Sequence, residues 1–147
     1  MKNLEATYND FLITTDRSKV DLELVHRFLS TESYWSKNIP LETVKGCVEN
    51  SLCFSVFRND NQVAFARIIS DFHSFAYLAD VFVVKEFRGL EISKWMMDFI
   101  MRHPNLQGLR RFCLGTHDAH SLYEKFGFQL IAKPEFFMEI KKENLYE

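Results

Sequence analysis

The pattern of apolar and polar residues changes most sharply between Tyr77 and Met101. Residues 77–84 form a nearly continuous apolar run, which is typical of a buried strand. The charged turn 85–89 follows and includes an Arg-Gly pair. Apolar residues then recur with the spacing of an amphipathic helix, at Ile92, Trp95, Met96, Phe99 and Ile100. The stretch therefore predicts a buried strand, a tight turn and a helix.

A helix that starts directly after a strand and a turn leaves its first backbone N–H groups without partners inside the helix. These groups and the positive end of the helix dipole favour a negatively charged ligand, above all a phosphate. We therefore expect the helix that begins near Ile92 to bind an anion at its N-terminus.

The residues before this stretch begin with a predicted strand and two predicted helices. An apolar run at 8–15 indicates the first strand. Ser18 and Asp21 match a capping box, and the apolar positions after them predict a helix over about 19–30. Pro40 suits the first turn of a second helix.

Three consecutive strands and a crossover are predicted next. Runs at 52–58 and 62–70 flank a short turn rich in Asn and Asp, which is typical of a β-hairpin, and 75–84 is the third strand. The strand 110–115 follows the central helix. A crossover through a helix makes 75–84 and 110–115 parallel. A cleft opens where two such strands part.

The C-terminal part predicts a short helix and two closing strands. Asp118 suits the N-cap of a helix over 119–126, and Gly127 suits its end. Residues 128–132 and 136–140 have the pattern of strands. The order of elements predicts an α+β fold with about four helices.

Composition and charge narrow the class of protein. The length of 147 residues favours one domain, 1–147, and 47% hydrophobic residues suffice for a core. A net charge of -2 and the lack of a long apolar run argue against nucleic acid and membrane partners. The segment 1–10 lacks the apolar core of a signal peptide. Three unevenly spaced cysteines, Cys47, Cys53 and Cys113, indicate reduced thiols and a cytoplasmic protein.

Two motifs resemble the GNAT superfamily of acyl-CoA-dependent N-acetyltransferases. One is the Val-x-x-x-x-Arg-Gly turn at Val83–Gly89, and the other is the Ala-x-x-x-Tyr-x-x-x-Gly-Phe run at Ala119–Phe128. The order of elements matches over nearly the whole chain. Particular segments of the sequence are similar to those of a group of bacterial GNAT proteins whose acceptor is generally unassigned. The resemblance implies a mixed, mostly antiparallel sheet with a parallel pair at the cofactor cleft.

The resemblance also implies how acetyl-CoA would bind as the acyl donor. A bulged strand would pair with the pantetheine arm and supply an amide to the thioester oxygen. The turn and the helix start would bind the pyrophosphate, and Tyr123 would protonate the departing thiolate. The implied cofactor-binding residues are Val81, Phe82, Val83, Arg88, Gly89, Leu90, Glu91, Ile92, Ser93 and Thr116.

One residue departs from the family pattern in a way that matters for function. Glu91 stands where a glycine is expected, and its bulk and charge oppose a pyrophosphate. Two hypotheses follow: an enzyme that acetylates an amine, or a binding or regulatory module of the same fold with weakened or lost CoA binding.

The remaining candidates have two interpretations each. Asp80 interrupts an apolar strand, so it is either a general base for the acceptor ammonium or a structural carboxylate that pairs with Arg67 or caps a loop. Tyr34 and Trp35 either bind the acceptor or cover the hydrophobic core. Arg67 is a weaker candidate of the same kind. Tyr123 is either the general acid or a core aromatic residue.

The sequence leaves the acceptor open between small molecules and peptides, and it leaves a homodimer open. His117 and His120 have a metal-like spacing but no third protein ligand, so no metal is expected.

Overall fold

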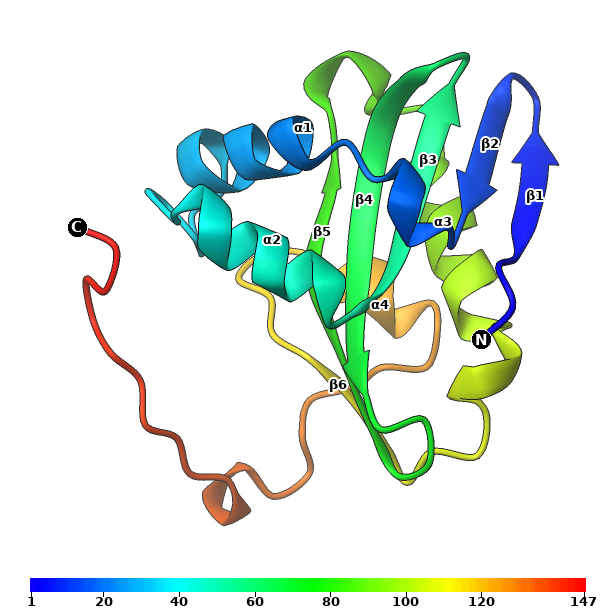
Figure 1. The fold of residues 1–147 in the computed structure, drawn as a ribbon. Coiled ribbons are helices and arrows are strands. Elements are labelled where there is room, and N and C mark those ends of the chain that lie inside the picture. The colour runs from blue at the N-terminus through cyan, green and yellow to red at the C-terminus, as the bar shows by residue number, and fades with distance from the viewer.

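A computed structural model describes all 147 residues and contains one six-stranded sheet in the order β1-β2-β3-β4-β5-β6 (Figure 1). Neighbouring strands are antiparallel except β5 and β6, which are parallel. None of the helices has the length and apolarity that crossing a bilayer requires. The strands are β1 (Glu5–Tyr8), β2 (Phe11–Thr14), β3 (Leu52–Arg58), β4 (Asn61–Ser70), β5 (Phe75–Val83) and β6 (Arg111–Leu114). The α-helices are α1 (Leu22–Arg27), α2 (Leu41–Glu49), α3 (Ile92–Met101) and α4 (His120–Glu124).

The sheet is covered on both faces, so it has two apolar clusters. On one face Phe54 and Ile68 of the sheet pack with Met96 and Ile100 of α3. The spacing of the buried residues of α3 explains why this helix lies flat on the sheet. On the other face the cluster joins the sheet to α1 and α2, with Phe28 stacked on Phe82 at 4.0 Å between ring centroids. The mixed α+β prediction is confirmed.

The N-terminal elements differ from the prediction in two ways. Of the strand predicted at 8–15, residues 11–14 form β2. An unpredicted strand, β1, precedes it, and the two form a hairpin because Asn9 adopts a left-handed conformation (φ 52°) that turns the chain. The helix predicted over 19–30 begins later. Asp21 accepts a hydrogen bond from the backbone N–H of Leu24 and is its N-cap, so Ser18 is not. A π-helical turn, Phe28–Glu32, follows α1.

The C-terminal elements differ more. The predicted closing strands 128–132 and 136–140 are absent, and the chain runs there as an irregular tail. The short helix predicted over 119–126 is α4, and its N-cap is Ala119 rather than Asp118. Gly127 has φ 95°, as expected for a residue that ends a helix. The tail does have the residue pattern of strands, but no strand of this chain pairs with it.

The parallel pair of strands positions the candidate site. β6 pairs with β5 only from Phe75 to Leu78, whereas β5 continues to Val83. Beyond Leu78 the two strands part, as the crossover through α3 predicted.

Candidate active site

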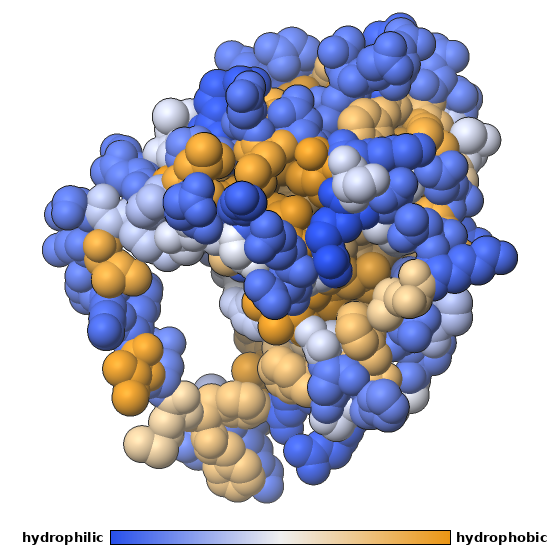
Figure 2. Space-filling view, in the orientation of Figure 1, coloured by the Kyte–Doolittle hydropathy of each residue, from blue (hydrophilic) through white to orange (hydrophobic).

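The cleft between the parted strands has two arms. The β6 arm has a volume of about 480 Å³ and lies between β5 and the loop after β6. The α3 arm has a volume of about 380 Å³ and lies between the end of β5 and the start of α3. Both arms share Val81 and Tyr123, so they form one continuous cleft. Figure 2 views the molecule from the side of α1 and α2, where apolar residues gather between polar ones.

A β-bulge shapes the edge of β5 in the cleft. The pairing with β4 shifts between Phe65, which lies opposite Phe82, and Arg67, which lies opposite Ala79. Asp80 is the extra residue and has φ 55°, in the left-handed region that Asp tolerates better than most residues. The bulge that the family resemblance implied is therefore present. It leaves backbone groups of 81–83 beside the cleft, where β6 no longer pairs with them.

Asp80 makes two strong contacts. Its Oδ2 atom accepts a hydrogen bond from Arg67 Nε at 2.6 Å, and its Oδ1 atom accepts one from Trp35 Nε1 at 2.8 Å. The Asp80 side chain is 8% exposed and that of Arg67 14%, so the ion pair is mostly buried. Because both carboxylate oxygens have partners, these contacts favour the structural interpretation of Asp80. Arg67 lies behind Asp80 and lines neither arm.

Tyr34 and Trp35 cross the cleft from the loop before α2. Trp35 binds Asp80 on β5, while the Tyr34 hydroxyl accepts a hydrogen bond from the backbone N–H of His117 at 2.9 Å, just after β6. The two rings are in edge-to-face contact, 5.0 Å apart between centroids. Both side chains are exposed and line both arms. This aromatic bridge places the two predicted residues at the mouth of the cleft.

The start of α3 has the geometry that an anion requires. No side chain caps the helix, and its first backbone hydrogen bond runs from Trp95 N–H to the Glu91 carbonyl. Gly89 has φ 82°, which suits glycine. Arg88 Nε donates to the Val83 carbonyl at 2.9 Å, which holds the arginine across the end of β5.

Glu91 also has a left-handed backbone, with φ 65°. The glycine that the family pattern has at this position would adopt this conformation without strain. The Glu91 side chain is exposed and forms an ion pair with Lys94 at 3.0 Å, which raises the pKa of Lys94. The carboxylate is thus turned toward a cation on the surface of α3.

Tyr123 lies where the two arms meet and is buried. Burial raises the pKa of its hydroxyl to about 12. The phenol therefore keeps its proton at neutral pH and can donate it. Thr116 lines the β6 arm, but its hydroxyl already accepts a hydrogen bond from Ala119 N–H at 3.0 Å. Among the other predicted residues, those that line the α3 arm are Val81, Phe82, Val83, Arg88, Gly89, Glu91, Ile92 and Ser93. Leu90 lines neither arm and is exposed.

Several residues that line the cleft were not predicted to do so. His117 and Asp118 line the β6 arm, and Phe28 and Leu122 line the α3 arm. The position of His117 and Asp118 directly after a parallel strand is a signal that could have identified them. No group of three or more His, Cys, Asp or Glu side chains is arranged to hold a metal ion.

Comparison with known proteins agrees with this geometry. The family model described as an acetyltransferase (GNAT) domain matches residues 49–130, which is more than half of the chain. The chain therefore belongs to the GNAT family of acetyltransferases, an enzyme family that transfers acyl groups to amines.

Individual relatives support the same assignment. A GNAT-family crystal structure from Xanthomonas campestris pv. campestris is 50% identical, has a TM-score of 0.91, and the match covers 92% of this chain and 96% of that one. A protein from Gibberella zeae, FG08082, whose name proposes an acetyltransferase activity, is 27% identical over 81% of this chain and 78% of its own. A Clostridium acetobutylicum structure described with acetyl-CoA shares the fold at 16% identity and a TM-score of 0.55, with 95% of each chain covered.

Proposed function

We propose that this protein transfers an acetyl group from acetyl-CoA to the amine of a small molecule or peptide. The observation that carries the proposal is the position of Tyr123, where a protonated phenol lies at the junction of the two arms. One arm offers backbone and a helix N-terminus to the acyl donor, and the other offers an aromatic bridge to the acceptor.

In the proposed complex the pantetheine of acetyl-CoA lies along 81–83, like an added strand. Its pyrophosphate lies at the uncapped start of α3, near Arg88 and Ser93. A backbone N–H of the bulged strand polarises the thioester carbonyl. A Clostridium acetobutylicum protein of this fold has been described with acetyl-CoA.

The acceptor enters through the β6 arm. Its amine attacks the thioester carbon, a tetrahedral intermediate forms, and the C–S bond then breaks. The CoA thiolate takes the proton of Tyr123. The proton that the attacking nitrogen gives up passes through solvent to the Tyr123 phenolate and restores the phenol. In this proposal Asp80 holds Arg67 and Trp35 in place, because its two oxygens are already engaged. Four expectations from the sequence stay predictions: that Asp80 is the general base, that the protein is cytoplasmic, that residues 1–147 form a single domain, and that the protein is a homodimer.

The alternative hypothesis, a non-catalytic module, depends on Glu91. Its carboxylate pairs with Lys94 at the surface, so the side chain leaves the helix N-terminus accessible to a phosphate. This arrangement favours the enzyme. Titration of the protein with acetyl-CoA, followed by calorimetry, separates the two hypotheses: the enzyme gives saturable binding, and the module gives none at millimolar concentration.

The proton donor is tested by Tyr123→Phe with thiol release measured over a panel of amines. General acid catalysis contributes about 10²–10⁴-fold, so kcat is expected to fall by that factor. The affinity for acetyl-CoA should stay near the wild-type value. Tyr34→Phe is the matched control, because it removes another hydroxyl from the same cleft and should cost much less. Equal losses in both variants would refute the assigned role.

A further inference from the structure

The β6 arm has a one-sided set of charged side chains. Its lining contains two acids, Asp80 and Asp118, and neither Lys nor Arg. Arg67 neutralises Asp80 from behind, through the contact at 2.6 Å, and lines neither arm. The imidazole of His117 packs on the Tyr34 ring, with 5.6 Å between the ring centroids, and so forms part of the wall. Asp118 is therefore the acid of this arm whose charge no cation of the chain balances.

The Asp118 carboxylate is not used to hold the fold. The sequence predicted it as the N-cap of α4, but that helix has no side-chain cap. The backbone N–H of Ala119 is bonded to the Thr116 hydroxyl instead. Asp118 lines both arms, and its charge adds to the effects of burial and of Tyr34 that raise the pKa of Tyr123 to about 12. The carboxylate thus lies close enough to the proton donor to act on it through space.

Aromatic side chains face the same arm. Tyr34 and Trp35 lie at its mouth in edge-to-face contact, and Tyr77 of β5 lines it from the sheet. The Tyr77 hydroxyl lies against Gly115, where a Cβ atom would be 3.2 Å from it. Aromatic faces attract alkylammonium ions, and a phenol oxygen accepts hydrogen bonds from them. Aromatic rings beside an unbalanced carboxylate therefore favour a cationic ligand.

We propose that the acceptor is an aliphatic amine with a second positive charge, and that Asp118 binds this second charge while the first amine reacts. This assignment rests on the proposed acyl transfer and adds the chemical class of its acceptor. The attacking nitrogen has to be neutral, so a carboxylate that held it as an ammonium would oppose the reaction. A second ammonium keeps its charge throughout, and its attraction to Asp118 persists until the product leaves.

The proposed acceptor fits the other properties of the arm. Leu78, Val81 and Leu114 offer an apolar surface to the methylene groups between two amines. The volume of about 480 Å³ accommodates a short chain of this kind. An amino acid is a poor acceptor by the same reasoning, because its carboxylate would lie near Asp118 with no Lys or Arg to balance it. The arm thus selects its acceptor by repulsion as well as by attraction.

Three acceptors of equal chain length test the proposed class. Putrescine, butylamine and γ-aminobutyrate carry the same reactive amine and end in a positive, an uncharged and a negative group. Thiol release with acetyl-CoA gives kcat/KM for each. A charge-assisted hydrogen bond should favour putrescine over butylamine by about tenfold, and γ-aminobutyrate should be the poorest acceptor. If butylamine or γ-aminobutyrate reacted as well as putrescine, the acceptor class would be wrong while the proposed acyl transfer stood.

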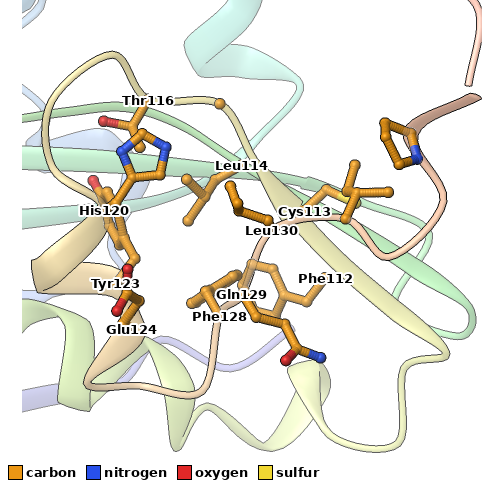
Figure 3. Close-up of a pocket in the computed structure, with 13 residues that line it drawn as sticks. Phe112, Cys113, Leu114, Thr116, His120, Tyr123, Glu124, Phe128, Gln129 and Leu130 are labelled. Carbon is orange, nitrogen blue, oxygen red and sulfur yellow. The ribbon is translucent and has the colours of Figure 1, made fainter.

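Asp118→Asn tests the residue itself. It removes the charge of an exposed side chain and keeps its size, so the ratio of kcat/KM for putrescine to that for butylamine should fall close to one. Glu124→Gln is the matched control. Glu124 lies near Tyr123 on α4 and lines the cavity of about 290 Å³ beside β6 (Figure 3), but it lines neither arm of the cleft. The control should keep the wild-type ratio, and an unchanged ratio in Asp118→Asn would refute the role of Asp118.

Binding without turnover separates this result from the proposed function. Putrescine is titrated calorimetrically into the protein alone and with CoA present. Saturable binding that weakens by about tenfold in Asp118→Asn would support the assigned anchor even if no acetyl transfer were detected. Transfer to no amine of the panel would refute the proposed function. Absence of saturable putrescine binding, or equal binding by Asp118→Asn and the wild type, would refute the acceptor class.

Discussion

The two arms of the cleft are built in different ways. The α3 arm is formed largely by one continuous stretch, 81–93, and it offers backbone groups. The β6 arm is assembled by side-chain contacts between segments far apart in the sequence, through Tyr34 and His117 on one side and Trp35 and Asp80 on the other. A site made of backbone tolerates variation of its side chains, whereas a site made of side-chain contacts depends on each of them. The predictions below test this difference.

Asp80→Ala should have the largest effect, on the β6 arm. It leaves the Arg67 charge without its partner in a mostly buried place, and breaking such a pair costs about 3 kcal/mol or more. For a chain of this size we expect Tm to fall by roughly 10 °C. Asp80→Asn, which keeps an acceptor for Trp35, should lose less. Calorimetry measures both. If these variants kept full stability but no longer showed the fall of kcat at low pH, Asp80 would instead be identified as the general base.

Glu91→Gly should strengthen the α3 arm. Glycine relieves a left-handed backbone that costs other residues about 1–2 kcal/mol, which should raise the stability of the fold. It also removes a negative charge near the pyrophosphate, which should strengthen binding. A gain of about 1 kcal/mol corresponds to roughly fivefold tighter binding of acetyl-CoA. Glu91→Gln separates the charge from the backbone effect. Calorimetric titration would contradict the prediction if neither variant bound more tightly than the wild type.

Trp35→Phe should affect mainly the β6 arm, although Trp35 lines both arms, because its hydrogen bond reaches Asp80. It removes a hydrogen bond to a carboxylate but keeps an aromatic ring at the mouth of the cleft. The loss of such a bond, about 1 kcal/mol at an exposed site, should raise KM for the acceptor about fivefold. KM for acetyl-CoA should stay the same, since the α3 arm is made mainly of backbone. Steady-state kinetics with each substrate varied in turn checks this, and a parallel rise in both KM values would show that the arms are coupled.

The smallest expected effect is that of pH on the wild-type enzyme, and it tests Tyr123, where the arms meet. A proton donor works below its pKa, and burial raises that pKa to about 12. Deprotonation of Tyr123 should therefore not lower the wild-type kcat between roughly pH 7 and pH 10, where the upper limit is about two units below the pKa. A decline that disappears in Tyr123→Phe would place the pKa lower and contradict the role of burial.

Local patterns explain which parts of the fold were predictable. The hairpin of β3 and β4, the strand β5 and the helix α3 follow from their periodicity and turn residues, and they were predicted nearly at their observed bounds. The prediction was wrong only about the start of the strand at 8–15, because the left-handed Asn9 turns the chain there and leaves β2 paired with an unpredicted strand, β1. It was also wrong at 128–132 and 136–140. A strand pattern states only that a segment can pair, and the pairing needs a neighbour that this chain does not place beside it.

The sequence by itself determined the strand, the turn and the uncapped helix from Tyr77 to Met101, because sterics and hydrogen bonding between near neighbours decide such elements. It also placed Tyr123 in the motif that the family shares. Only the tertiary structure decided what Asp80 does, because the partners of a carboxylate depend on segments such as the one at Trp35 that folding brings to it. The same holds for the turned side chain of Glu91 and for the unpaired edge of β6. Charge and strand pairing act through space, and the sequence alone does not fix which residues meet there.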